Sequence, residues 1–168
     1  MRKIAMLLEN QFDDRELIYP YYRLQEEGFA VDLIGAKQDT IYKSKHGMPM
    51  KSDRASSDVK AEEYEAVVIP GGFSPDYMRR TQATIDFVKA MNNLRKPIAA
   101  ICHAPWVVIS ATDLHNRKMT GFPTVRKDIE NAGATYLDEE VVVDDNLITS
   151  RTPNDLPAFL KAIIAALQ

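Results

Sequence analysis

Residues 96–111 have the sequence KPIAAICHAPWVVISA, and this stretch decides the fold. Its first part, KPIAAI (96–101), has the short, unbroken apolar character of a strand that is buried on both faces. Its last part, APWVVISA (104–111), predicts an apolar helix that follows with no polar loop between the two elements. Cys102 and His103 therefore occupy a sharp turn from a strand into a helix.

The same succession of short apolar strands and amphipathic helices extends along the chain in both directions. Buried strands are expected at residues 3–8, 30–36, 65–70 and 96–101. Helices are expected at residues 15–28, 81–94, 104–111, 125–133 and 154–168. Residues 40–53 predict a polar β excursion that turns at His46-Gly47, and residues 140–150 predict a hairpin that turns at Asp145-Asn146. This succession predicts an α/β fold with a mostly parallel sheet and helices on both faces.

Apolar spacing within the helices predicts which side chains face the core. These side chains are Leu17, Tyr21 and Leu24 in the first helix, Ile85, Val88 and Leu94 in the helix at 81–94, and Leu156, Phe159, Leu160, Ile163, Ile164 and Leu167 in the last helix.

Length and composition exclude several classes of protein. A chain of 168 residues predicts one domain with a substantial core. A formal net charge of -3 and a pI of about 5.6 argue against nucleic-acid and anionic-membrane partners. The apolar runs are too short for a signal peptide or a membrane span, and a single cysteine excludes intramolecular disulfides. Together these features predict a cytoplasmic protein.

The histidines outside the 102–103 turn do not suggest a metal site. His46 and His115 lie in polar, turn-like segments, which favours surface positions over metal ligation. We therefore expect neither a metal nor a cofactor.

Unusual residues follow three of the expected strands. They are residues 9–16 after the first strand, Gly71-Gly72 after the third and Cys102-His103 after the fourth. In a parallel sheet, ligands bind off the carboxyl ends of the strands. The sequence therefore predicts that these three segments form one functional site.

Cys102 is the candidate nucleophile of this site. A thiol at a strand-to-helix turn, like the nucleophile elbow of α/β hydrolases, lies near the N-terminus of the following helix. The dipole and free N–H groups of that helix favour the thiolate, which predicts a pKa of roughly 5–6. The alternative is that a lone cysteine is only a small core side chain. His103 is either a base beside the thiol or a residue that caps the helix or faces a neighbouring subunit.

Gly71-Gly72 and Glu16 each allow two interpretations. The glycines let the backbone approach a bound group and could hold a developing oxyanion with their N–H groups, or they form a plain tight turn. Glu16 is by default an exposed glutamate of a helix. If it faces Cys102 instead, burial beside the sulfur raises its pKa and keeps it protonated as a hydrogen-bond donor.

Six blocks in a fixed order carry a resemblance to a known family. They are FDDRELIYPYYRLQEEGF (12–29), SKHGMPM (44–50), VVIPGGFSPDYMR (67–79), AAICHAP (99–105), VRKDIENAGA (125–134) and EVVVDDNLITSRTPNDLPAF (140–159). With these blocks the chain resembles the PfpI branch of the DJ-1/ThiJ/PfpI superfamily over nearly its whole length, residues 1–168. The resemblance implies one domain with a flavodoxin-like, three-layer α/β sandwich.

The resemblance also implies roles for individual residues. Cys102 would be the nucleophile, Glu16 would hydrogen-bond to it, and the backbone N–H groups of Gly72 and His103 would form the oxyanion hole. In peptidase-like members an acid from a neighbouring subunit orients the histidine, and Asp76 is its counterpart here. The family therefore implies a homodimer or a higher homo-oligomer such as a hexamer.

Two positions depart from the family pattern. Asp76 stands where many members have the longer Glu, and Ala104 stands where Gly is usual after the Cys-His pair. Both departures weaken the peptidase interpretation more than the reactive-cysteine interpretation. Glutamine amidotransferases share the elbow, but they need a histidine far downstream of the cysteine, and none follows His115.

Three functions are compatible with the sequence. The first is a cysteine-dependent enzyme of stress protection, a hydrolase or a glyoxalase III- or deglycase-like enzyme, that acts on reactive aldehydes or their protein adducts. The second is an intracellular cysteine peptidase that acts on peptides through Cys102, His103 and Asp76. The third is a non-enzymatic oxidative-stress sensor or chaperone that uses the same cysteine.

Overall fold

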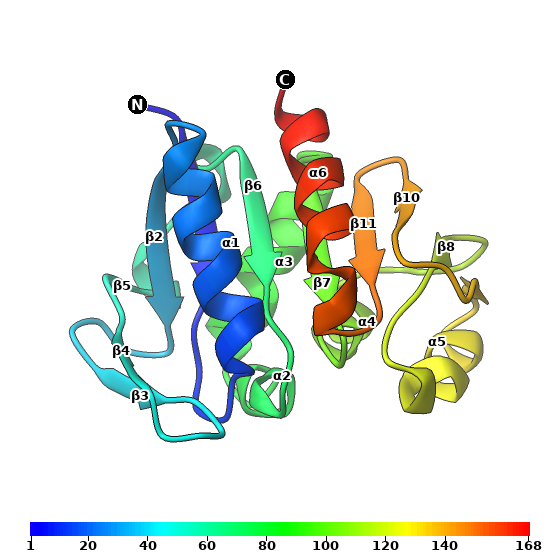
Figure 1. Cartoon of the computed structure of the whole chain (residues 1–168), viewed down its shortest axis with the longest axis horizontal. Coiled ribbons are helices and arrows are strands. Elements are labelled where there is room, and N and C mark those ends of the chain that lie inside the picture. Colours follow the sequence, from blue (N-terminus) through cyan, green and yellow to red (C-terminus); the bar gives the residue numbers. More distant parts are fainter.

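A seven-stranded sheet runs through the middle of the computed structural model, which describes residues 1–168 (Figure 1). Its strands lie in the order β10 (Val142–Asp144), β11 (Leu147–Ser150), β7 (Ile98–Ile101), β6 (Ala66–Ile69), β1 (Lys3–Leu7), β2 (Ala30–Gly35) and β5 (Arg54–Ala55). Every neighbouring pair is parallel except β10 with β11. The mostly parallel sheet predicted from the sequence is confirmed.

Helices cover both faces of the sheet and make the three-layer, flavodoxin-like sandwich. In Figure 1, α1 (Asp14–Glu26) and α6 (Leu156–Leu167) lie in front of the sheet, and α3 (Gln82–Asn93) and α4 (Pro105–Ala111) lie behind it. The remaining helices and strands are α2 (Ser74–Met78), α5 (Arg126–Asn131), the antiparallel pair β3 (Ile41–Lys43) and β4 (Pro49–Lys51), and the parallel pair β8 (Lys118–Met119) and β9 (Thr135–Tyr136). Four short 3₁₀ turns lie at Ser56–Asp58, Ala61–Glu63, Pro123–Val125 and Pro153–Asp155.

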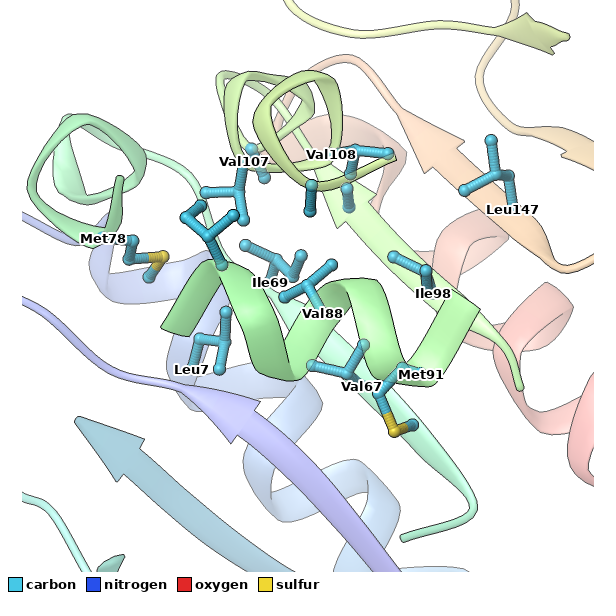
Figure 2. Packing of buried hydrophobic residues seen from close by; sticks show 14 of the residues in the cluster. Leu7, Val67, Ile69, Met78, Val88, Met91, Ile98, Val107, Val108 and Leu147 are labelled. Atoms are coloured by element: carbon cyan, nitrogen blue, oxygen red, sulfur yellow. The ribbon is translucent and has the colours of Figure 1, made fainter. Parts of the chain in front are cut away.

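Each central strand supplies side chains to two separate hydrophobic clusters. Successive residues of a strand point to opposite faces, so Ala5 and Leu7 pack with α3 and α4, whereas Ile4 and Met6 pack with α1 and α6. Figure 2 shows Leu7 of β1 and Val88 of α3 among the residues of the first of these clusters. Burial on both faces explains why the strands have unbroken apolar sequences rather than alternating ones.

Most expected elements are present, and one inward residue was predicted wrongly. The hairpin turns at Asp145-Asn146 as predicted, between β10 and β11. In α6 the predicted stripe is buried except for Ile164, which is half-buried. Leu94 is wrong as a core residue: it is the C-cap of α3 and is 45% exposed, because the helix ends before its side chain reaches the sheet.

Several short elements had no clear sequence signal. Residues 74–78 form the short helix α2, which was not among the helices expected from the sequence. β5, β8 and β9 have two residues each, which is too short for a visible hydrophobic period. No helix of the structure is both long enough and apolar enough to cross a lipid bilayer.

Matched leucine substitutions test the packing of α6. Leu160 is 1% exposed within the cluster beneath α1 and α6, whereas Leu94 is 45% exposed. Leu160→Ala should lower the free energy of unfolding by about 2–5 kcal/mol, because it leaves a cavity in the core. Leu94→Ala should change it by less than about 1 kcal/mol. Urea denaturation of both variants measures the difference, and equal losses would contradict this placement of α6.

Candidate active site

The three strand ends singled out in the sequence meet at one edge of the sheet. Glu16 of α1, Gly72 after β6, and Cys102 and His103 after β7 line a single pocket of about 340 Å³. Their meeting follows from the strand order, because β1, β6 and β7 are adjacent and parallel. The predicted convergence of these residues is therefore present in the structure.

Cys102 forms the turn between β7 and α4 in a strained backbone conformation. Its φ of 64° lies in the left-handed region, which costs a non-glycine residue about 1–2 kcal/mol. Two backbone hydrogen bonds hold this conformation: the Cys102 N–H donates to Ser150 O at 3.0 Å, and the Phe122 N–H donates to Cys102 O at 2.8 Å. The sulfur is thereby directed into the pocket, as at a nucleophile elbow.

The pKa of the Cys102 thiol is raised, which contradicts the expected value of roughly 5–6 based on helix N-termini. Burial is the main cause, since the side chain is 7% exposed, and the negative charge of Glu16 adds to it, raising the pKa from 9.0 to about 12. Hydrogen bonds from the backbone N–H groups of His103 and Gly72 act in the opposite direction. The resting form of Cys102 is therefore the neutral thiol.

His103 is placed to receive the proton of this thiol. Its Nδ1 lies 3.2 Å from the Cys102 Sγ. The ring stacks on Phe122 with centroids 4.8 Å apart and meets the edge of Trp106 at 5.0 Å. Burial and the positive charge of Lys45 lower the pKa of His103 below 6.5, so the imidazole is neutral at pH 7. A neutral imidazole accepts a proton at Nδ1 when its hydrogen is on Nε2.

Glu16 is fully buried beneath the pocket rather than exposed on its helix. Its Oε1 accepts a hydrogen bond of 2.9 Å from the Gly71 N–H, and its Oε2 has no hydrogen-bond partner within the chain. The hydrogen bond between Glu16 and Cys102 that the resemblance implied is therefore not formed, because Oε1 is engaged by the backbone of Gly71. Burial and the nearby charge of Asp13 raise its pKa from 4.5 to about 7. Glu16 can therefore give or take a proton near neutral pH.

Gly71 allows the acid and the thiol to approach each other. A Cβ atom at this position would lie 2.5 Å from Glu16 Oε1 and 2.7 Å from Cys102 Cβ. Both distances are far below van der Waals contact, so only glycine fits between the two side chains. The glycine pair therefore does more than form a tight turn.

The next residue, Gly72, has a different role. Its φ is +69°, and its N–H is one of the two donors directed at the Cys102 sulfur; the other is the N–H of His103. Two such N–H groups beside a nucleophile are the geometry of an oxyanion hole. The role of this pair as an oxyanion hole, which the resemblance implied, stays a prediction.

Three charged residues line the pocket without a role assigned from the sequence: Asp13, Arg15 and Lys45. Asp13 is the N-cap of α1 and is 2% exposed, and its carboxylate accepts the N–H groups of Arg15 and Glu16 at 3.0 and 3.3 Å. Lys45, from the turn between β3 and β4, places Nζ 2.7 Å from Asp13 Oδ2. The spacing of Asp13 and Glu16 is typical of a helix N-terminus, and this cap signal was the only clue to Asp13.

Asp76 lies in α2 and contacts arginines of its own helix region. Its carboxylate accepts hydrogen bonds from Arg80 at 2.7 Å and from Arg79 at 3.4 Å. These contacts lower its pKa. Asp76 is not among the residues that line the Cys102 pocket of its own chain.

Replacement of Glu16 should change how stability depends on pH. The folded state holds the Glu16 proton more tightly than the unfolded state, so stability falls as pH rises from about 4.5 to about 7. At about 1.4 kcal/mol per pKa unit, this loss is roughly 3 kcal/mol. Glu16→Gln cannot ionise and should lack the loss. Urea denaturation at pH 4 and pH 8 measures it, with the exposed Glu26→Gln as control; identical pH dependence of all three proteins would contradict the raised pKa.

Comparisons with known proteins agree with the fold. The model of the DJ-1/PfpI family matches residues 2–166. The Pyrococcus furiosus protein "Deglycase PfpI" is 40% identical over 166 residues, which are 99% of each chain. The Bacillus subtilis protein "Putative cysteine protease YraA" is 45% identical over 158 residues, which are 94% of each chain.

One solved structure has nearly the same fold. It is a two-domain protein from Anabaena variabilis that contains DJ-1/ThiJ/PfpI-like and ferritin-like domains, with 43% sequence identity and a TM-score of 0.97. The similarity covers 99% of this chain and 48% of that one. By its family match, its relatives and its fold, this chain belongs to the DJ-1/PfpI family.

Proposed function

We propose that this protein is a Cys102-dependent enzyme that converts α-oxoaldehydes such as methylglyoxal, or their adducts on proteins, into hydroxy acids. The observation that carries the proposal is the arrangement around the sulfur: a base at 3.2 Å, two N–H donors and a buried acid with a pKa of about 7. The pocket of about 340 Å³ suits a small carbonyl compound better than an extended peptide.

The first step is addition of the thiol to the aldehyde carbon. As the new S–C bond forms, the thiol proton passes to His103 Nδ1 and the carbonyl electron pair moves onto oxygen. The N–H groups of Gly72 and His103 stabilise that oxyanion, which then takes a proton to give a hemithioacetal. Proton transfer during attack explains how a thiol with a raised pKa can act as a nucleophile.

The later steps need no external oxidant. Glu16 removes the proton from the former aldehyde carbon and returns it to the neighbouring carbonyl carbon. The hydroxyl proton of the first carbon passes to the oxygen of the second, so that the first carbon is oxidised to the thioester carbonyl and the second is reduced to an alcohol. The product is a thioester of a hydroxy acid. Water cleaves the thioester, the hydroxy acid leaves, and Cys102 recovers its proton.

The names of relatives support this proposal without separating the two enzyme classes. The related protein from Pyrococcus furiosus is named a deglycase, and the one from Bacillus subtilis is named a putative cysteine protease. We place the peptidase second, because its histidine needs an orienting acid and Asp76 is engaged by Arg79 and Arg80. The raised pKa of Cys102 also does not favour a peroxide sensor, since peroxide oxidises the thiolate.

A homodimer or a larger homo-oligomer, in which Asp76 of one copy reaches His103 of another, stays a prediction from the family resemblance. So does a cytoplasmic location, which agrees with a single free cysteine. Light scattering at micromolar concentration tests the assembly. A strict monomer would remove Asp76 from the site.

Substitutions of the two central residues test the proposed chemistry. Cys102→Ser should abolish lactate formation from methylglyoxal, because a hydroxyl is a much weaker nucleophile. Glu16→Gln should lower kcat by about 10²–10⁴ and leave hemithioacetal formation intact, because only the later proton transfer is lost. Lactate assays and mass spectrometry of the trapped adduct measure the two effects, with the exposed Glu26→Gln as control.

A parallel assay separates the alternatives. A glycated peptide and an unfolded protein are offered to the wild type and to Cys102→Ser. Cys102-dependent cleavage of the unfolded protein, with no turnover of methylglyoxal or of the glycated peptide, would replace the proposed function by the peptidase.

A further inference from the structure

We propose that Arg15 and Lys45 form an anion-binding subsite beside Cys102, so that the preferred substrate is an aldehyde that carries a carboxylate. This inference rests on the proposed function for the reaction but not for the binding. Both cations line the same pocket as the nucleophile. Neither is part of the proton transfers assigned to Cys102, His103 and Glu16.

The charges at this position do not cancel. The Arg15 Nη2 and Lys45 Nζ atoms lie 3.3 and 2.7 Å from Asp13 Oδ2, so two cations share one carboxylate. The Arg15 Nε also contacts Asp13 Oδ1, at 3.4 Å. The remaining acid of the pocket, Glu16, has a pKa of about 7 and is only partly ionised at neutral pH. The pocket therefore keeps a net positive charge while the thiol and imidazole are neutral.

The two cations also have free donor capacity. The side chains of Arg15 and Lys45 are 64% and 38% exposed, whereas that of Asp13 is 3% exposed. The buried Asp13 carboxylate thus binds both cations on their buried side, and other N–H groups of each cation remain free to donate to a ligand. A guanidinium with an ammonium beside it is a suitable partner for a carboxylate.

The field of these cations reaches the reacting groups. The charge of Lys45 adds to the burial that lowers the pKa of His103, and the charges of Lys45 and Arg15 oppose the burial that raises the pKa of Glu16. Glu16 also lines the pocket, and its buried Oε2 has no hydrogen-bond partner within the chain. Because the exposed Arg15 and Lys45 and the buried Cys102 line one pocket, a substrate whose carboxylate meets the two cations can direct its carbonyl carbon toward the sulfur.

Alkylation of Cys102 tests the subsite without any catalytic turnover. Iodoacetate and iodoacetamide are nearly the same size, and each forms an S–C bond as iodide leaves and the thiol proton is lost; they differ in the negative charge of the first. The same sulfur attacks both reagents. A change in the pKa or the exposure of the thiol therefore alters both alkylation rates by the same factor and leaves their ratio unchanged. The wild type should prefer iodoacetate about three- to tenfold more than free N-acetylcysteine does.

Charge-removing variants locate the effect. Arg15→Gln and Lys45→Gln should each bring the ratio toward that of N-acetylcysteine, and added salt should do the same by screening. Lys89→Gln removes an equal charge from an exposed position on α3, on the opposite face, and should leave the ratio unchanged. A wild-type ratio equal to that of N-acetylcysteine, or equal ratios in all four proteins, would overturn the subsite.

A second measurement extends the test to substrates. An α-oxoaldehyde with a terminal carboxylate should have a kcat/KM about three- to tenfold above that of its neutral methyl ester, and Arg15→Gln should remove the difference. If neither compound is converted, the proposed reaction is wrong, and the alkylation ratio still decides the subsite. Equal kcat/KM values for both compounds in the wild type would reject the subsite but not the proposed reaction.

Discussion

The site depends on two backbone hydrogen bonds that hold Cys102 in a left-handed conformation. One comes from the end of β11, through Ser150 O, and the other from Phe122, after β8. These bonds tie the turn after β7 to two segments that lie far along the chain. Any loss of register between β7 and β11 would therefore displace the sulfur from its N–H donors, and the chemistry of the pocket is linked to the correct pairing of the sheet.

The sequence predicted the fold well because the fold is encoded by local patterns. Strands buried on both faces require unbroken apolar runs, and β6 and β7 have them along their whole length and β1 from Ile4 onward. The hairpin at Asp145-Asn146 also has a local signal. In contrast, two-residue strands are made by the approach of distant segments, and the exposure of Leu94 depends on the residue at which α3 ends. Neither property can be obtained from hydrophobic periodicity.

The identity of the site residues was easier to predict than their protonation. The convergence of Glu16, Gly72 and Cys102 follows from adjacent parallel strands. The pKa of the thiol, however, is a balance between helix-terminal donors and desolvation, and the degree of burial is a property of the whole tertiary structure. Lys45 had no predicted role for a similar reason, since it reaches the pocket from the β3–β4 turn, which is distant in sequence.

A buried thiol that stays protonated at rest has a consequence for the durability of the molecule. The thiolate is the form that peroxide oxidises, and further oxidation to the sulfinic and sulfonic acids is essentially irreversible. Cys102 is shielded both by its burial and by its proton. Under the proposed mechanism, the sulfur becomes a strong nucleophile only while a carbonyl compound occupies the pocket. Idle copies of the protein would then present little thiolate to an oxidant.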